Sequence, residues 1–341
     1  MTRAHSSSDR PERPLRSRRA LMGWMAGAGG AAMLPSLAQA QAPYPQKPVR
    51  IIVPYTAGGA SDVLARLIAS KLQVSLGQPV IVENKVGASG AIGTDYVAKS
   101  PADGHTLVVS DLGTLTIGPS LYPNLPFDVE RDLAPVSILT SSPYLVTVNP
   151  GLPIHNLKGL IDYSRAHPTA LNYASSGIGT NPHMAGLLFA TRMGLQWTYI
   201  PSKGGSQAIT DVIGGQADLM FNSAFSTSAF VKGGKLRLLA VSTAKRVAAY
   251  PDVPSLSEVL PGYDTGAFQA LFAPAGTPAN VIARLNGEVT RILALPEVKQ
   301  QLDGLGAEAY GSTVDAMRQF VREDRQRWAR LVKEQNFKVE R

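Results

Sequence analysis

The 341-residue chain contains no cysteine. This absence excludes disulfides, thiolate metal sites and cysteine nucleophiles. Histidine is also scarce, with His5, His105, His155, His167 and His183 as its only occurrences. None of them has a metal-ligand spacing such as HxxxH, so we expect no metal site. Because 44% of the residues are hydrophobic, the chain can form a stable core without cross-links.

Sequence motifs for catalysis and for cofactor binding are missing as well. The Gly58-Gly59 pair lacks the GxGxxG spacing of a dinucleotide site, and no GxxxxGK[ST] motif is present. Ser176 precedes His183 closely, but the GxSxG motif of a nucleophile elbow is absent. We therefore expect neither a cofactor nor an enzyme, and a hydrolase that uses Ser176 and His183 is the minor alternative.

The first forty residues are typical of an export signal. Arg16, Arg18 and Arg19 precede a modestly apolar stretch at residues 20–32, and Ala38-Gln39-Ala40 fits a small-x-small cleavage site. The arginine pair followed by Leu21 resembles a twin-arginine signal, while the ordinary secretory route stays open. We predict a periplasmic protein that is cleaved near Ala40. The apolar stretch is too short for a transmembrane anchor.

Removing this segment halves the formal net charge of the chain. Residues 1–40 hold six Arg and two acidic residues, so 33−6 leaves 27 basic and 25−2 leaves 23 acidic side chains, and the formal net charge falls from +8 to +4. A mild positive balance suits small anionic ligands. It is too weak and too dispersed to indicate nucleic-acid binding.

Two strand–turn–helix junctions stand out in the remaining chain. At residues 49–72 a β-branched run stops at a glycine-rich turn, which leads directly into an amphipathic helix. Residues 171–193 repeat this order, with Asn181 and Pro182 fitting the start of a helix. Free N–H groups at such turns favour anions, so two of them could hold one small anion from opposite sides. Glycines that serve close packing alone are the structural alternative.

Other polar residues are candidates for ligand binding because they follow predicted strands. Ser110, Asp111 and Thr114 follow a predicted strand at residues 105–110, and ligands usually lie beyond the carboxyl ends of parallel strands. Lys203 and Gly204 follow a predicted strand at residues 197–200. Lys203 could neutralise an anion, although a solvated surface lysine is an equal alternative.

Alternating short apolar runs and helical patterns predict an α/β protein with two domains. We predict further strands at residues 79–83, 217–221, 235–243 and 268–273, and two strand stretches within residues 136–148 that are separated by Ser141-Ser142-Pro143. Helices are predicted at residues 94–99, 157–165, 207–213, 279–293, 296–302 and 314–334. The chain is expected to cross between the domains within residues 136–148 and to return within residues 251–263. Arg325, Arg327 and Arg330 fit a solvated helix face.

Several stretches carry a family resemblance: VPYTAGGASDVLARLIASKL, LGQPVIVENKVGASGAIG, DGHTLVVS, ASSGIGTNPHMAGLLF and YIPSKGGSQAITDVIGGQADLMF. They resemble the Bug (TctC-like) family of extracytoplasmic solute receptors of tripartite tricarboxylate transporters. The resemblance implies a two-lobed α/β fold of the periplasmic-binding-protein type II (Venus flytrap) class. Residues 43–144 and 265–341 would form lobe 1, and residues 145–264 would form lobe 2.

The resemblance also implies that two loops bind carboxylate groups through backbone N–H groups, hydroxyls and waters. The predicted ligand-binding residues are Tyr55, Thr56, Ala57, Gly58, Gly59, Ser61, Asp62, Ser110, Asp111, Thr114, Ser175, Ser176, Gly177, Gly179, Thr180, His183, Lys203 and Gly204. Asp62 would repel an anion, so we expect it to bond backbone amides or a water in preference to the ligand.

The predicted partners are a small organic acid and the membrane permease subunits, with the receptor itself a monomer. A citrate-like acid, a linear dicarboxylate, an acidic amino acid and an aromatic acid all fit a small polar cleft. A periplasmic sensor that feeds a two-component system is the alternative to a transport receptor.

Overall fold

Strands and helices alternate along residues 44–337, the part of the chain that the computed structural model describes. The predicted export signal at residues 1–40, including its cleavage site near Ala40, lies outside the described residues. Between residues 44 and 337, no helix has the length and apolar character that crossing a membrane requires.

The strands follow the predicted positions closely, except for the two-residue strand at Glu308–Ala309, which was not predicted. They are β1 (Val49–Val53), β2 (Val80–Asn84), β3 (Thr106–Asp111), β4 (Leu133–Val148), β5 (Asn172–Ser175), β6 (Thr198–Pro201), β7 (Leu219–Ser223), β8 (Arg237–Val241), β9 (Gly266–Pro274) and β10 (Glu308–Ala309). The helices are α1 (Ala60–Leu76), α2 (Ala91–Ala98), α3 (Leu112–Leu121), α4 (Leu157–Ala166), α5 (Asn181–Met193), α6 (Gly205–Ile213), α7 (Ala224–Lys232), α8 (Ala279–Leu293), α9 (Pro296–Gly304) and α10 (Val314–Glu334). Two short 3₁₀ turns, η1 (Ala88–Gly90) and η2 (Leu256–Glu258), complete the described part.

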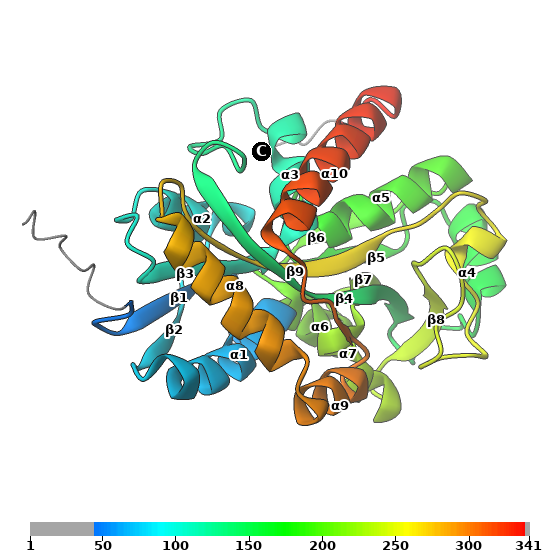
Figure 1. Ribbon diagram of the computed structural model, residues 1–341. Helices are drawn as coiled ribbons and strands as arrows, with labels where there is room; N and C mark the ends of the chain where they lie inside the picture. Colours follow the sequence, from blue (N-terminus) through cyan, green and yellow to red (C-terminus); the bar gives the residue numbers. More distant parts are fainter. Residues whose placement is uncertain (1–43, 338–341) are drawn as a thin grey trace, which may run out of the picture. The chain divides into compact units, whose positions relative to one another are not determined.

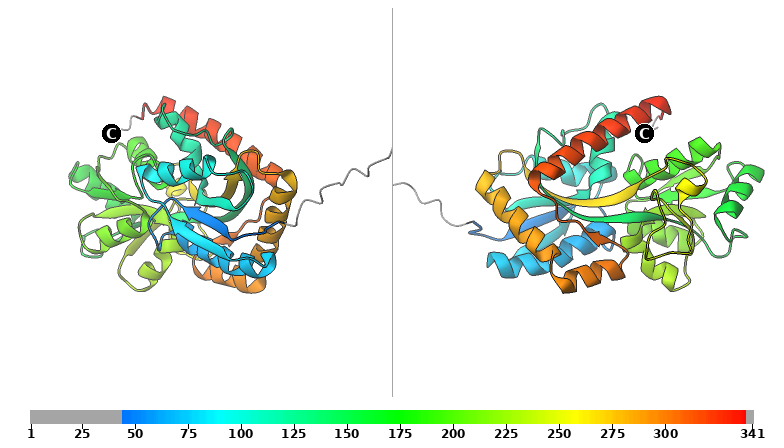
Figure 2. Two further views of the ribbon diagram at one scale, coloured as in Figure 1. Left: turned by 90° about the vertical axis from the view of Figure 1, so that its left-hand side faces the viewer. Right: turned by 45° about the vertical axis from the view of Figure 1, so that its right-hand side comes forward.

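One curled sheet runs through the described residues in the order β2-β1-β3-β9-β4-β7-β5-β6, and β8 and β10 both pair with β4 (Figure 1). The first half-sheet comprises β1, β2, β3, β9, β10 and the part of β4 before Tyr144. The second half-sheet comprises the remainder of β4 with β5, β6, β7 and β8. β4 and β9 therefore carry the chain between the halves, and the right-hand view of Figure 2 shows both strands along this path.

A separate hydrophobic core supports each half-sheet. In the first half, Val49, Ile51 and Val53 of β1 are fully buried against α1 and α8. Helix α1 ends at Gly77, whose φ of 67° is the left-handed conformation that glycine adopts readily. In the second half, Phe189 of α5 packs against Phe221 of β7. A smaller cluster of Ile117 on α3, Met184 on α5 and Trp328 on α10 packs the two halves against each other.

Two helices were absent from the predictions. Leu112–Leu121 forms α3, which is buried almost all round and packs beside α10 (Figure 1). Its apolar residues therefore show no 3.6-residue periodicity, which is the pattern that marks a surface helix. Ala224–Lys232 forms α7. Thr227 and Ser228 are buried in it although they are polar, so its buried face shows no continuous apolar stripe in the sequence.

Two details of the predicted crossing were wrong. β4 is continuous through Ser141, Ser142 and Pro143 because these residues pair with Phe268, Ala267 and Gly266 of β9. The return crossing is made by β9, whereas residues 251–263 stay in the second half. Leu256 and Tyr263 are buried in its core, and Ser255 bridges to Val241 of β8. Tertiary pairing outweighs the local turn preference of Ser and Pro in both places.

Asn286 on α8 ties this helix to the sheet. Its amide Nδ2 donates to the carbonyl oxygens of Val136, at 2.7 Å, and of Ser312, at 2.9 Å. The N286A variant leaves both carbonyls without this donor, so we expect it to lose about 2 kcal/mol of unfolding free energy in urea titrations. The exposed Asn280 on the same helix provides the control N280A, which should shift the midpoint little. Equal midpoints for N286A and the wild type would contradict this role.

Candidate functional site

The two predicted turns connect β1 to α1 and β5 to α5. We call residues 54–62 the first cradle and residues 175–183 the second cradle. Helix α1 begins after Gly59, and α5 begins after Thr180 with proline in its first turn. Neither N-cap residue makes a side-chain capping bond. The first-turn amides of α1 are therefore available to another acceptor. In α5 the Asn181 N–H donates to Thr114 Oγ1 at 3.1 Å and Pro182 has no N–H, so the second cradle offers fewer free amides.

Both cradles line one small cavity, which we call the cleft cavity and whose volume is about 40 Å³. It is lined by Tyr55, Gly59, Ala60, Ser61, Asp111, Thr114, Tyr144, Ser176, Thr180, Pro182, Gly205, Asn222, Ser223 and Gln269. A cavity of this volume holds roughly three waters. A small organic acid needs more space, so the two sides must separate to admit one.

Direct hydrogen bonds hold the two sides together around this cavity. Thr56 Oγ1 lies 2.7 Å from Ser206 Oγ. The carbonyl of Ile178 accepts from Ser89 Oγ at 2.8 Å and from Tyr122 OH at 2.9 Å. These bonds join the loops of the first half to the second cradle and to α6. The two halves are thus in direct contact around the cavity.

Asp62 stabilises the first cradle from outside the cavity lining. Its Oδ2 accepts from the Gly58 N–H at 2.9 Å, and its carboxylate is also bound by Arg66 and Asn84. Burial alone would raise the pKa of Asp62, but the bonds from Arg66, Gly58 and Asn84 outweigh it and hold the pKa below its usual value. The predicted bond to a backbone amide is confirmed. Asp62 is not among the residues that line the cleft cavity.

His183 supports the second cradle in a similar way. Its Nδ1 accepts from the Gly179 N–H at 3.0 Å, and its ring packs against Tyr199 with 4.0 Å between the centroids. Burial lowers the pKa of His183 to about 4, so the ring is neutral at physiological pH. Because Nδ1 is already an acceptor for Gly179, it is not free to activate Ser176.

The remaining predicted residues fall into two groups. Ser110 and Ser175 are buried behind the cavity wall, where Ser110 Oγ lies 3.2 Å from the Tyr55 hydroxyl and Ser175 Oγ lies 3.4 Å from Thr180 Oγ1. A second group, namely Thr56, Ala57, Gly58, Gly177, Gly179 and Gly204, forms the cradle backbones or the seam between the halves and does not line the cavity. Lys203 is exposed on a turn and also lies outside the lining.

Sequence reasoning missed several lining residues. Asn222 and Ser223 end β7, so the rule that directed attention to Ser110 and Asp111 would also have found them. Tyr144 and Gln269 lie on the crossing strands β4 and β9, and no sequence signal marks them. Gln269 Oε1 accepts from Ser61 Oγ at 2.5 Å, which ties the first cradle to β9.

Asp111 forms the floor of the cleft cavity. Its Oδ1 caps α3 by accepting from the Thr114 N–H at 2.9 Å, and Oδ2 lies 3.3 Å from the Tyr144 hydroxyl. Burial raises the pKa of Asp111 to about 6, although bonds from Thr114 and Tyr144 act in the opposite direction. An aspartate ordinarily titrates near 3.9, so this carboxyl retains its proton to a higher pH in the folded protein than in the unfolded chain.

This difference predicts a pH-dependent stability. The Asp111 contribution should be fully present below about pH 4 and lost as the pH rises through about 6, by on the order of 3 kcal/mol. D111N keeps the helix cap, since Asn and Asp cap equally well, and removes the charge. Melting temperatures of D111N and the wild type should therefore diverge between pH 4 and pH 7 in favour of D111N. A constant difference across this range would contradict the prediction.

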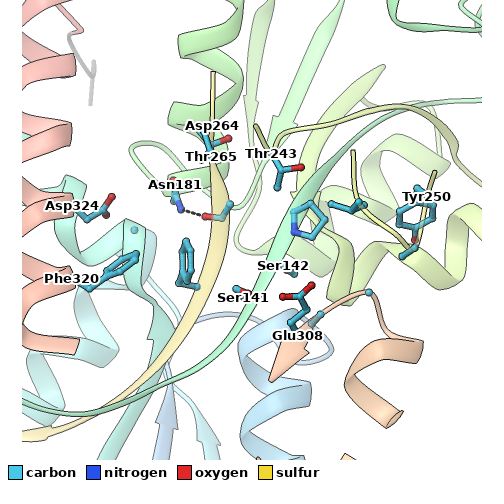
Figure 3. A pocket seen from close by; sticks show the side chains of 18 of the residues that line it. Ser141, Ser142, Asn181, Thr243, Tyr250, Asp264, Thr265, Glu308, Phe320 and Asp324 are labelled. Carbon is cyan, nitrogen blue, oxygen red and sulfur yellow. Dashed lines mark hydrogen bonds between the residues drawn. The ribbon is translucent and has the colours of Figure 1, made fainter. Parts of the chain in front are cut away.

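A larger hollow of about 850 Å³ lies on the opposite face of the crossing strands, and we call it the rear hollow (Figure 3). Successive strand residues point to opposite faces, so Tyr144 and Gln269 line the cleft cavity whereas Pro143 and Phe268 line the rear hollow. Asn181 is the only residue of either cradle that lines the rear hollow. Its Nδ2 donates to the Gly266 carbonyl at 2.9 Å. We therefore place the candidate site in the smaller cavity.

The arginines of α10 were predicted to form a solvated face, which was wrong for two of them. Arg325 binds Asp128 and Glu130, and Arg327 binds Asp324 and the Asp264 carbonyl. Arg327 also lines the rear hollow together with the exposed Arg330. Asp128 and Glu130, the partners of Arg325, lie far away in the sequence, so helical periodicity could not reveal them, whereas Asp324 is three residues from Arg327 on the same helix.

The two half-sheets, their hydrophobic cores and the cavity between the cradles define an α/β two-lobed fold of the periplasmic-binding-protein type II class. Residues 64–337 match the family model of the tripartite tricarboxylate transporter family receptor, TctC. The chain belongs to this family of periplasmic solute-binding proteins, as the sequence resemblance predicted. Its members are receptors, and the structural neighbours are binding proteins.

Individual relatives agree with this assignment. Protein BugT of Bordetella pertussis is 37% identical over 298 residues, which are 87% of this chain and 91% of the relative. The solved structure of Rhodopseudomonas palustris Rpa4515 with adipate has a TM-score of 0.84 at 32% identity and covers 87% of this chain and 99% of its own. MatC from the same organism, with bound malate, has a TM-score of 0.81 at 33% identity and covers 85% and 100%.

Proposed function

We propose that this protein captures a small organic carboxylate between the two cradles and delivers it to the permease of a tripartite tricarboxylate-type transporter. The observation that carries the proposal is that Gly59 and Ser61 of the first cradle line the same cavity as Ser176 and Thr180 of the second. Two relatives of the same fold hold adipate and malate, which supports a carboxylate as the ligand class.

The chemistry of the lining fits an anion that is held by neutral donors. The lining of the cleft cavity includes no Lys, Arg or His, and the Ser176 hydroxyl contributes to it. The hydroxyls of Ser61 and Thr180 also line it, but they donate to Gln269 Oε1 and to the Gly177 carbonyl and would have to turn toward a ligand. Hydrogen bonds from neutral donors to a carboxylate are worth about 1.5–3 kcal/mol each. Four or five of them would support roughly micromolar binding after the costs of ordering.

The strand register supports lobe boundaries close to the predicted ones. In this proposal, residues 43–144 and 265–341 form lobe 1, and residues 145–264 form lobe 2. The switch of β4 from β9 pairing to β7 pairing between Pro143 and Tyr144 supports these limits, as does the start of β9 at Gly266. Closure of the lobes on a bound ligand would create the state that the permease distinguishes from the empty receptor. Export with cleavage near Ala40 and a monomeric receptor complete the proposal.

A ligand screen on the purified mature protein tests this function. Mono-, di- and tricarboxylates and acidic amino acids are added one at a time, and the melting temperature is recorded. A ligand at 100 times its dissociation constant stabilises by about 2.7 kcal/mol, which gives a clear shift. Small-angle scattering with the best acid should then report a more compact particle than without it. A melting temperature that no acid raises would contradict the proposed function.

A further inference from the structure

Asp111 is the one lining residue of the cleft cavity whose side chain carries a charge at neutral pH, since the remaining lining side chains are aliphatic, hydroxyl, amide or phenol groups. Its side chain is buried, with 7% of its surface exposed. A negative charge in this position opposes a ligand that carries only carboxylates. It favours a ligand that carries a positive charge as well.

Oδ1 of Asp111 is fully used within the protein. It accepts from the Thr114 N–H at 2.9 Å and from Thr114 Oγ1 at 3.2 Å. Oδ2 accepts from the Tyr144 hydroxyl at a long 3.3 Å, and the neutral Asn181 amide also interacts with the carboxylate. A carboxylate oxygen has room for a second and stronger donor. Oδ1 of Asp111 is therefore occupied by capping α3, whereas Oδ2 can accept a hydrogen bond from a ligand in the cavity.

The groups that surround Asp111 supply no cation. Tyr55 faces it from the loop after β1, Tyr144 faces it from β4, Thr114 from α3 and Asn181 from α5. Burial raises the pKa of both tyrosines, so these phenols stay protonated and neutral. The Asn181 amide donates to the Gly266 carbonyl and also interacts with the Asp111 carboxylate, but it is neutral. A buried carboxylate without a partner cation is costly, and a ligand ammonium would remove that cost.

We propose that Asp111 makes this receptor selective for an amino acid, whose carboxylate is held between the cradles while its ammonium group donates to Asp111 Oδ2. The inference rests on the proposed function, because it needs the carboxylate to occupy the cleft cavity. It names the substrate class among the acids that the cavity chemistry allows, and it makes Asp111 the specificity-determining residue.

Calorimetry with matched ligand pairs tests the assignment at pH 7.5. L-Glutamate is compared with glutarate and L-aspartate with succinate, because each pair differs only in the ammonium group. The wild type should bind the amino acid of at least one pair about 10-fold or more tightly than its partner, which corresponds to about 1.4 kcal/mol. D111N should lose this preference while it binds the diacid as well as or better than the wild type. L-Malate replaces the ammonium by a hydroxyl and should bind the wild type less tightly than L-aspartate.

The pH dependence supplies an independent readout. Binding of the preferred amino acid to the wild type should strengthen between pH 5 and pH 7.5 as Asp111 ionises, because its pKa lies at about 6. The affinity of D111N for the same amino acid should stay flat. The control D324N removes another buried carboxylate, which lies on α10 outside the lining of the cleft cavity, and should leave the selectivity unchanged.

The outcomes separate the two proposals. If the wild type binds none of these acids and no other acid of the screen, the proposed function itself fails. If the wild type binds glutarate, succinate or malate as tightly as the matched amino acid and D111N behaves alike, the selectivity role of Asp111 is overturned while the receptor function stands.

Discussion

Replacing Gly59 with leucine is expected to abolish carboxylate binding without unfolding the protein. Gly59 precedes α1 with φ −77° and ψ 171°, a conformation open to any residue. A Cβ at this position would meet only the Thr56 carbonyl oxygen, at an ordinary 3.4 Å. Because Gly59 lines a cavity of about 40 Å³, the leucine side chain occupies the space that a ligand carboxylate needs. We expect an affinity loss of more than about 100-fold, or roughly 2.7 kcal/mol.

Calorimetry with the best acid from the ligand screen measures this loss. G287L is the matched control, since Gly287 is exposed on α8 and no atom lies within 4 Å of a Cβ placed there. Both variants should melt within a few degrees of the wild type. If G59L retained wild-type affinity, the first cradle would be wrongly assigned as a ligand site.

Replacing Gly204 with valine is expected to weaken ligand binding by preventing the two halves from closing. Gly204 has φ 166°, which is extended backbone, so valine causes no conformational strain. A Cβ at Gly204 would lie 2.3 Å from Thr56 Oγ1 and 3.1 Å from the Thr56 backbone nitrogen. Thr56 belongs to the opposite side of the seam, so the valine acts as a wedge between the halves. We expect ligand affinity to fall about 100-fold because the closed state is disfavoured.

S206A provides a graded comparison for the wedge. It removes the Ser206 hydroxyl that lies 2.7 Å from Thr56 Oγ1 and adds no bulk. Loss of one such bond should weaken binding by only about 5-fold, or roughly 1 kcal/mol. Scattering should show that G204V stays expanded at ligand concentrations that compact the wild type and S206A. Identical scattering curves for all three proteins would refute the wedge.

Local sequence signals were sufficient for the two strand–turn–helix junctions. The β-branched run of β1, the small residues before α1 and the Asn181-Pro182 start of α5 each encode their own local structure. The relation between the two junctions, however, is a property of the closed fold. The cavity that they share depends on how β4 and β9 bring the halves together, and no stretch of sequence contains that information.

The lining residues Tyr144 and Gln269 could not be predicted for the same reason, because they reach the cavity only in the tertiary fold. Tyr144 reaches the cleft cavity because β4 continues past Pro143, where its pairing with β9 ends and its pairing with β7 begins at Ser223. Gln269 lines the cavity from β9 in the same way, within a strand that was predicted only for its apolar residues. Lys203 illustrates the opposite error, because a cation near a predicted ligand loop lies on an exposed turn away from the lining. Side-chain direction at a domain seam requires the tertiary structure.

The strand order also governs how the chain assembles. β9 lies between β3 and β4, although β3 ends at Asp111 and β9 begins only at Gly266. During synthesis, β3 and the start of β4 therefore emerge from the ribosome long before the strand that joins them. Any fragment that stops short of Gly266 has two unpaired strand edges, which invite association with other chains. Contacts this distant in sequence also slow folding, so the receptor needs nearly its whole length before its first half-sheet can close.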